Sequence, residues 1–235
     1  LMKQTVAFLP GLLCDADLFT AQIAAMQAAG HSTRVADFTG EDQVSISAMA
    51  AKLIDELPER FSLVALSMGG YVALEVLAQA PERVERVALL DTNARADDPA
   101  AAARRRDLLR LAERGRFLGV APRLMPLYLH ESRLKDDDLT GAVAGMAERL
   151  GADVFRRQQG AILGRRDHRQ TLAAFDGPLL VLCGRQDQVT PLARSEEMAG
   201  LAPNAVLTVI EDCGHMSTME RPEAVNAALL DWMDR

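Results

Sequence analysis

Short segments rich in apolar and β-branched residues alternate with longer segments of helical spacing between residues 4 and 95. The short segments TVAFLP, STRVADF, FSLVALS and VERVALLD predict strands that begin at residues 5, 32, 61 and 84. Helical spacing predicts helices over residues 16–29, 45–57 and 69–80, which stop at Gly30, Pro58 and Pro81. Strand, helix and strand in repetition predict a parallel sheet with helices on both faces.

This alternation stops at Asp97 and resumes with the apolar segment PLLVLCG at residues 178–184. In between, arginine, alanine and leucine recur at helical spacing. Glycines at positions 115, 119, 151 and 160 punctuate this stretch, which predicts several short helices.

After the strand at 178–184, a helix from about Pro191, the strand AVLTVIED and a helix over Pro222–Met233 complete the chain. We therefore expect an α/β fold with a mainly parallel six-stranded sheet. The expected core domain comprises residues 2–96 and 173–235, and residues 97–172 form a helical insertion.

The 235 residues have an ordinary globular composition, with 49% hydrophobic and 25% charged residues. The net charge of −7 argues against a nucleic-acid-binding face, which requires clustered lysines and arginines. The run Arg104–Arg106 is the exception, and we expect a solvated helix face there because adjacent helical residues fan around the axis. We also expect His130 and His168 at solvated positions.

No stretch reaches the roughly 18 consecutive apolar residues of a membrane span, and the first residues predict a strand rather than a leader. We therefore expect a cytoplasmic protein without membrane contact. Three cysteines without a CxxC pair predict reduced thiols rather than a disulfide framework or a zinc site. We expect no metal and no cofactor, and we leave a homodimer open.

Three residues with the chemistry of nucleophilic catalysis follow three different predicted strands. Ser67 ends the segment FSLVALS, Asp187 follows PLLVLCG, and His215 lies between the last strand and the last helix. Open parallel sheets bind ligands at the carboxyl ends of their strands, so these side chains can meet at one edge. A serine hydroxyl needs a base to accept its proton and a third group to orient that base. The small residues Ala65 and Gly69 suit a sharp turn at the serine.

Each of the three residues has a plainer explanation when it is taken alone. Ser67 and Asp187 can cap helices or close turns, and an isolated histidine is more often a surface or core residue than a base. Asp91, at the end of VERVALLD, is an alternative partner for His215. All three residue types in three corresponding loops favour the catalytic interpretation.

The chain resembles the α/β-hydrolase superfamily from about Val6 to its C-terminus. LVALS with MGGYVALEVLA resembles the nucleophile elbow of that family, VLCGRQDQVTP its acid loop, and CGHMSTMERPEAVNAAL its histidine loop and final helix. The resemblance implies Ser67 as the nucleophile, Asp187 as the acid and His215 as the base, in the chain order of that family. Because the loop of Asp187 matches the family pattern closely, the resemblance favours Asp187 over Asp91. Ala65 takes the first position of the usual Gly-x-Ser-x-Gly, a change of one methyl group.

The same resemblance implies an oxyanion hole formed by the backbone N–H groups of Leu12 and Met68, with Leu13 as the near alternative. The loop FLPGLLCDADLF carries a Pro–Gly pair where relatives carry His–Gly. The six expected strands imply a sheet that lacks the first two strands of the eight in the full family sheet.

The insertion resembles the helical cap that shapes the substrate pocket in this family. The candidate pocket residues are Leu13, Cys14, Leu124 and Tyr128. The resemblance is nearest to capped bacterial esterases and 3-oxoadipate enol-lactonase-like enzymes. It implies hydrolysis of a small-molecule carboxylic ester or lactone through an acyl-enzyme.

Two other functions stay open. A carbon–carbon bond hydrolase of the meta-cleavage type would use the same triad, with Arg123 or Arg157 holding a carboxylated dienoate. A non-catalytic binding protein would keep the fold with a vestigial triad. The presence of all three triad residues in order favours an enzyme.

Overall fold

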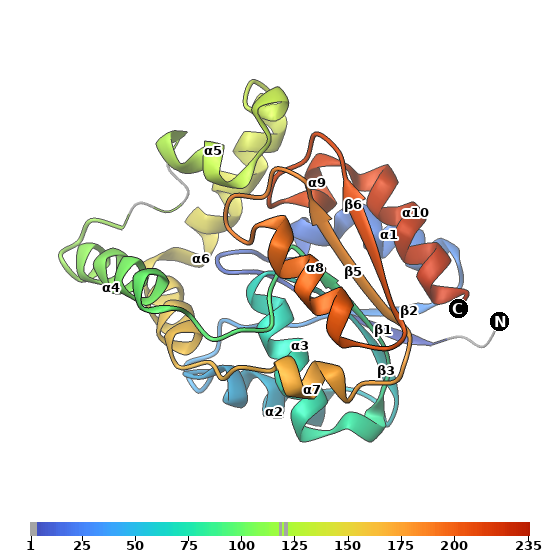
Figure 1. Cartoon of the computed structure of the whole chain (residues 1–235). Helices are drawn as coiled ribbons and strands as arrows, with labels where there is room; N and C mark the ends of the chain where they lie inside the picture. The colour runs from blue at the N-terminus through green and yellow to red at the C-terminus, as the bar shows by residue number, and fades with distance from the viewer. Residues whose placement is uncertain (1–3, 118, 120–121) are drawn as a thin grey trace.

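Six parallel strands form the centre of the protein in the computed structural model, which describes residues 4–117, 119 and 122–235 (Figure 1). Their order in the sheet is β2-β1-β3-β4-β5-β6. Their bounds are β1 Thr5–Leu9, β2 Ser32–Val35, β3 Phe61–Leu66, β4 Val84–Leu90, β5 Leu179–Gly184 and β6 Ala205–Ile210. Each predicted strand is present, and the expected α/β fold is confirmed. Residues 2 and 3, with which the predicted core domain begins, lie outside the described residues.

Helices pack on both faces of this sheet. The helices on one face are α2 (Ile46–Glu56), α3 (Met68–Gln79) and α8 (Leu192–Leu201). Those on the other face are α1 (Thr20–Ala28), the short α9 (Ser217–Glu220) and α10 (Pro222–Met233). The helix predicted from residue 16 begins as a 3-10 turn over Ala16–Phe19 and becomes α-helical at Thr20.

The central strand β3 is apolar at every position except Ser62. All of its residues are buried, because successive side chains enter the cores on opposite faces of the sheet. Leu63 and Ala65 pack on the face of α2 and α3, whereas Val64 and Leu66 pack on the face of α1 and α10. The edge strand β2 is only partly buried, which accounts for its mixed composition.

The segment between β4 and β5 is helical, as predicted. Its helices are α4 (Pro99–Glu113), α5 (Met125–Tyr128), α6 (Asp137–Leu163) and α7 (Arg169–Ala173). The range of α6 holds two helical stretches that meet at Gly151, whose φ of +77° and ψ of −177° are not helical, so this glycine punctuates the segment as predicted. The prediction is wrong for Gly160, through which the second stretch continues.

The helices of this segment do not all lie in one place. Figure 1 shows α4, α5 and α6 together on one side of the molecule, whereas α7 packs against α3 and α8. The division at residues 97 and 172 into a core and a cap stays a prediction. Among the described residues, no helix combines the length and the apolar character needed to cross a bilayer.

Candidate active site

Ser67 lies in a sharp turn between β3 and α3. Its φ is +53°, a left-handed conformation that is strained for a residue other than glycine. A Cβ on Gly69 would lie 1.9 Å from the carbonyl oxygen of Leu9, so only glycine fits there. The loop after β1 also lies against the turn, since a Cβ on Gly11 would lie 3.3 Å from the Cβ of Ser67. Ala65 is fully buried in β3, and the turn forms with its methyl group in place of the usual glycine.

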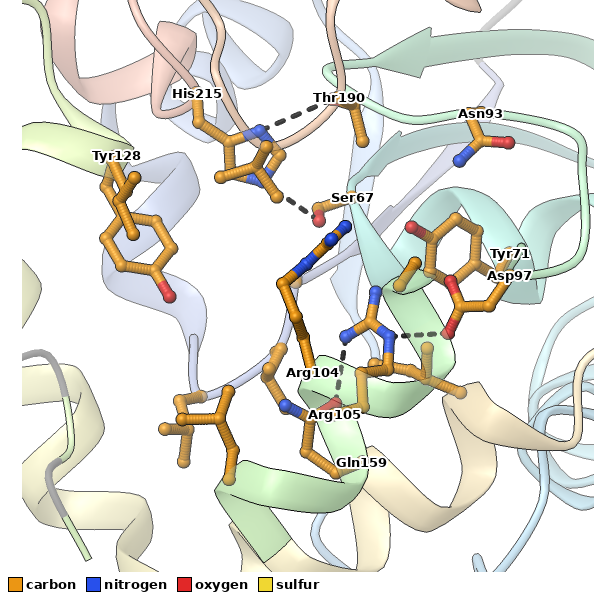
Figure 2. Close-up of a pocket in the computed structure, with 18 of the residues that line it drawn as sticks. Ser67, Tyr71, Asn93, Asp97, Arg104, Arg105, Tyr128, Gln159, Thr190 and His215 are labelled. Atoms are coloured by element: carbon orange, nitrogen blue, oxygen red, sulfur yellow. Dashed lines mark hydrogen bonds and ion pairs between the residues drawn. The ribbon is translucent and has the colours of Figure 1, made fainter. Parts of the chain in front are cut away.

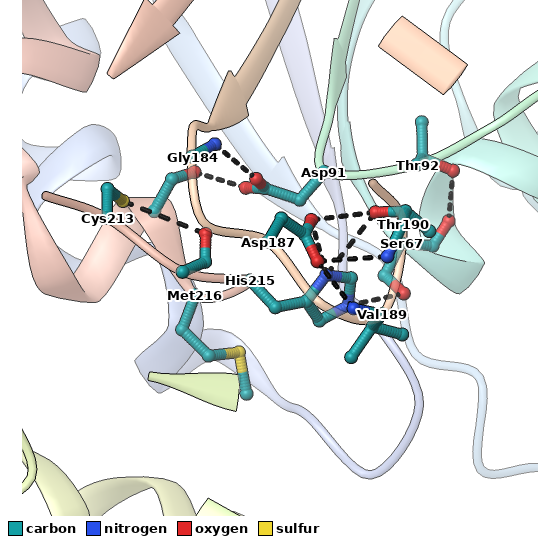
Figure 3. A network of polar contacts seen from close by, with 12 residues as sticks. Ser67, Asp91, Thr92, Gly184, Asp187, Val189, Thr190, Cys213, His215 and Met216 are labelled. Atoms are coloured by element: carbon teal, nitrogen blue, oxygen red, sulfur yellow. Dashed lines mark hydrogen bonds and ion pairs between the residues drawn. The ribbon is translucent and has the colours of Figure 1, made fainter. Parts of the chain in front are cut away.

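Ser67, His215 and Asp187 form a continuous chain of hydrogen bonds (Figure 3). Nε2 of His215 lies 3.0 Å from Oγ of Ser67, and Nδ1 lies 2.8 Å from Oδ2 of Asp187. The backbone N–H groups of Val189 and Thr190 donate to Oδ1 of the carboxylate at 2.8 and 2.9 Å. The loops after β3, β5 and β6 therefore bring together the three residues that the sequence singles out.

The electrostatics of this chain favour an ion pair between His215 and Asp187. Burial acts to raise the pKa of Asp187, but the charge of His215 and hydrogen bonds from His215 and Thr190 outweigh burial, and the pKa is lowered. Burial acts to lower the pKa of His215, but the charge of Asp187 and its hydrogen bond raise that pKa above the ordinary 6.5. A more basic imidazole is suited to accept a proton from a serine hydroxyl.

Asp91 lies behind this chain without joining it. One of its oxygens accepts the N–H of Gly184 at 2.9 Å, and the other is hydrogen-bonded to the hydroxyl of Ser217. Burial, reinforced by the negative charge of Asp187, raises the pKa of Asp91 well above its ordinary value. Asp187 rather than Asp91 therefore contacts His215, in agreement with the choice made from the sequence.

Glu220, which the sequence pattern does not single out, holds the loop that carries His215. Its carboxylate accepts the backbone N–H groups of His130 at 2.8 Å, Gly214 at 3.0 Å and Met216 at 3.2 Å. These bonds satisfy the amides on both sides of His215. The side chain is 1% exposed, and no local hydrophobic period marks it, so only the tertiary structure reveals it.

Two backbone N–H groups at the turn are available to a ligand. Among the described residues, the N–H groups of Leu12 and Met68 have no hydrogen-bond partner. The N–H of Leu13, in contrast, donates to Oε1 of Gln158 at 2.9 Å. This geometry leaves Leu12 and Met68, rather than Leu13, able to donate to an oxyanion.

A cavity of about 820 Å³ borders Ser67 and His215 (Figure 2). Its walls include the loop after β1, residues of α4, α5 and α6, and the segments that follow β4 and β5. The candidate pocket residues all line it: Leu13, Cys14, Leu124 and Tyr128. Burial raises the pKa of the Cys14 thiol to about 12, so this thiol stays protonated at neutral pH and cannot act as a second nucleophile.

The arginine run of α4 faces this cavity in part. Arg104 and Arg105 line it, whereas Arg106 lies outside the lining. Arg104 and Arg106 are exposed, as predicted for a solvated face, and Arg105 is only partly exposed because it pairs with Asp97. Arg123 and Arg157 are absent from the described lining, and Arg157 donates instead to a backbone carbonyl after β2 at 2.7 Å.

The two histidines expected at the surface have different environments. His130 is partly buried, and its Nδ1 lies 2.8 Å from the hydroxyl of Ser132. The prediction is wrong for His168, which is buried with Nε2 2.8 Å from a carboxylate oxygen of Glu75 in α3. Glu75 also binds Arg166 at 2.6 Å, so the partners of His168 lie in a polar cluster that makes its burial tolerable.

Comparison with known proteins supports the same assignment of fold. A family model described as the alpha/beta hydrolase family matches residues 5–228. The chain is 30% identical over 212 residues to the Mycobacterium tuberculosis protein "Putative non-heme bromoperoxidase BpoC", covering 86% of this chain and 78% of that protein. It is 28% identical over 203 residues to the pimeloyl-[acyl-carrier protein] methyl ester esterase of Nitrosomonas europaea, covering 76% of this chain and 73% of that protein.

A solved structure is similar over almost the whole chain. The thermophilic esterase of Thermogutta terrifontis, determined with malate bound, has a TM-score of 0.88 and 28% identity, covering 99% of this chain and 90% of that one. The strand order, the turn at Ser67 and the family match agree with one another. This chain belongs to the alpha/beta hydrolase family.

Proposed function

We propose that this protein is a serine hydrolase that cleaves a carboxylic ester or a lactone, with Ser67 as nucleophile, His215 as general base and Asp187 as the acid that orients the base. The observation that carries the proposal is the unbroken chain of hydrogen bonds from Ser67 to Asp187, at 3.0 and 2.8 Å. The esterases among the similar proteins support an ester as the substrate.

In the first half of the reaction, Nε2 of His215 accepts the proton of the Ser67 hydroxyl while Oγ attacks the carbonyl carbon. The N–H groups of Leu12 and Met68 stabilise the negative charge that develops on the carbonyl oxygen. His215 then gives the proton to the leaving alcohol, and the acyl group stays on Ser67. In a lactone, the alcohol stays tethered to that acyl group.

In the second half, His215 takes a proton from a water molecule, and the oxygen of that water attacks the acyl carbon. The oxyanion forms again at the same two N–H groups. His215 returns the proton to Oγ as the carbon–oxygen bond to Ser67 breaks, which releases the acid and restores the free serine.

Residues 97–172 act as the cap in this proposal. They supply Leu124 and Tyr128 to the cavity, while the loop after β1 supplies Leu13 and Cys14. These side chains contribute to the apolar part of the wall, which suits the hydrocarbon portion of an ester.

The test is hydrolysis of p-nitrophenyl acetate, butyrate and hexanoate by the wild type and by Ser67→Ala. We expect Ser67→Ala to lose at least about 1,000-fold in kcat, because no other group can form the acyl-enzyme. Ser132→Ala, an exposed serine outside the cavity, is the matched control and keeps wild-type rates. Equal rates for the wild type and Ser67→Ala would contradict the proposal.

One observation favours a second candidate, the carbon–carbon bond hydrolase of the meta-cleavage type. Its substrate carries a carboxylate, and arginines do line the cavity, although they are not the two expected from the sequence. Ser67-dependent loss of the absorbance of a ring-fission product, with no turnover of esters, would favour this candidate. Rates no higher than the uncatalysed rate for both substrate classes, in the wild type as in Ser67→Ala, would favour a non-catalytic binding protein.

A cytoplasmic location, a homodimeric assembly and the lack of nucleic-acid and membrane partners remain predictions from the sequence. Light scattering after size-exclusion chromatography tests the assembly. Fractionation of cells that express the protein tests the location.

A further inference from the structure

The cavity beside Ser67 carries an excess of positive charge in a protein whose net charge is −7. Seven arginines line it, against three aspartates, Asp97, Asp98 and Asp167. Four of the arginines form ion pairs with carboxylates: Arg95, Arg105, Arg165 and Arg169. Among the described residues, three have no carboxylate within 4.0 Å: Arg104, Arg116 and Arg194.

The ion pairs do not neutralise the cavity. Asp97 holds Arg105 at 2.7 Å and Arg165 at 2.8 Å, so one carboxylate balances two guanidinium groups. Arg105 also donates to Oε1 of Gln159 at 2.8 Å. Asp98 is exposed and caps α4 by accepting the N–H of Ala101 at 2.8 Å. Asp98 also attracts Arg104 and Arg194, from beyond the 4.0 Å of an ion pair. The lining keeps more arginines than carboxylates, and this net positive charge favours an anionic ligand.

Arg104 is the unpaired arginine best placed to meet a ligand at Ser67. It lies on the face of α4 that lines the cavity, together with Ala101 and Leu108, at the spacing of one helical face. Figure 2 shows its side chain rising from α4 into the cavity, toward the side on which Ser67 and His215 lie, while Arg105 turns back to Asp97. The Arg104 side chain is exposed, and in the part of the chain that the structure describes its guanidinium has no hydrogen-bond or ion-pair partner, so its donors are available to a ligand that enters the cavity.

We propose that the cavity takes a substrate with an oxyanionic group, a carboxylate or a phosphate, remote from the bond that is cleaved, and that Arg104 holds this group. A guanidinium binds such groups through two parallel N–H donors. A positively charged cavity also raises the local concentration of anionic ligands. The apolar wall formed by Leu13, Leu124 and Tyr128 contacts the chain between the two groups. The inference rests on the proposed function, since the same ligand must present its ester to Ser67.

The test compares two esters of equal chain length, the mono-p-nitrophenyl ester of glutaric acid and p-nitrophenyl pentanoate. In the wild type, kcat/KM for the anionic ester exceeds that for the neutral ester by roughly tenfold or more, because a charge-assisted bond forms only with the former. Arg104→Gln removes this preference through KM, and Arg104→Lys keeps part of it. Arg106→Gln, on the solvent side of the same helix, keeps the wild-type preference and is the matched control.

Inhibition of pentanoate ester hydrolysis separates the two kinds of oxyanion. A lower inhibition constant for glutarate than for butyl phosphate identifies a carboxylate, and the reverse order identifies a phosphate. If neither inhibits better than pentanol, the inference is overturned.

The kinetic outcomes distinguish this inference from the proposed function. A wild type without preference for the anionic ester, or a preference that persists in Arg104→Gln, overturns the inference while Ser67-dependent hydrolysis still supports the proposed function. Hydrolysis that does not depend on Ser67 overturns both.

Discussion

Oε1 of Gln158, in α6, accepts a hydrogen bond from the backbone N–H of Leu13, in the loop after β1, at 2.9 Å. The amide nitrogen of Gln158 donates to the carbonyl of Phe38 at 3.1 Å, and the side chain is 1% exposed. Leu13 has a φ of +56°, a conformation that leucine keeps only when its surroundings hold it. The helical insertion therefore holds the loop to which we assign the oxyanion hole.

Replacement of Gln158 tests this positioning role. Gln158→Leu removes the acceptor for Leu13, so we expect kcat for a p-nitrophenyl ester to fall roughly tenfold, with a much smaller change in KM, because the loop shifts and its donor is misplaced. Gln158→Glu keeps an acceptor and should retain more of the kcat. Thermal denaturation measured alongside separates positioning from folding: a lower Tm with an unchanged kcat would show that the contact is only structural.

The raised pKa of His215 sets the pH dependence of the reaction. Protonated imidazole cannot act as a base, so kcat/KM for a neutral ester should rise with pH and level off, with a midpoint above 6.5. Asp187→Asn removes the charge that raises this pKa, so NMR titration of His215 should give a lower midpoint in the variant. A wild-type midpoint at or below 6.5 would contradict the ion pair.

Asp91 and Asp187 can be told apart by the same substitution. Asparagine has the shape of a protonated aspartic acid, and burial favours that form of Asp91, so Asp91→Asn should keep most of the activity. Asp187→Asn should lose about 10,000-fold in kcat, because the base is no longer held in the correct tautomer. Comparable losses in the two variants would assign Asp91 a part in the triad.

Stability measurements give Asp91 a second test. Its raised pKa means that the folded protein binds this proton more tightly than the unfolded chain does, so the free energy of unfolding should fall as pH rises from the unfolded toward the folded pKa. Asp91→Asn should remove that contribution. Urea denaturation at pH 5 and pH 8 measures it, and an identical pH slope in the wild type and the variant would show that Asp91 is not protonated.

The approach of Gly69 to Leu9 makes the turn at Ser67 intolerant of a side chain. Gly69→Ala places a Cβ 1.9 Å from a backbone oxygen, so we expect a loss of at least about 3 kcal/mol in the free energy of unfolding. Gly160→Ala, in α6, meets nothing within 4 Å and should stabilise the protein by up to about 1 kcal/mol. Chemical denaturation of both variants checks the contrast, and wild-type stability in Gly69→Ala would contradict the close contact.

Local sequence was sufficient for the sheet and for the three residues of the proposed triad. The strand β3 is buried on both faces, so the apolar run at residues 63–66 is unbroken and easily recognised. Ser67, Asp187 and His215 each follow the end of a strand, and parallel strands bring such ends to one edge. These features depend on residues that are close together in the chain. The apolar residues of a strand and the small residues of the turn that follows it are both visible in the local sequence.

Only the tertiary structure decided which groups surround that edge. Gln158 and Leu13 are distant in sequence, so no local pattern connects them. The spacing of α4 predicts how Arg104 and Arg106 diverge around the helix, but not which of them meets the cavity, because the packing of α4 against α6 sets that rotation. Burial of Glu220 depends likewise on amides supplied by another segment. Local propensity determines elements, whereas contacts between distant segments determine which side chains lose water and face one another.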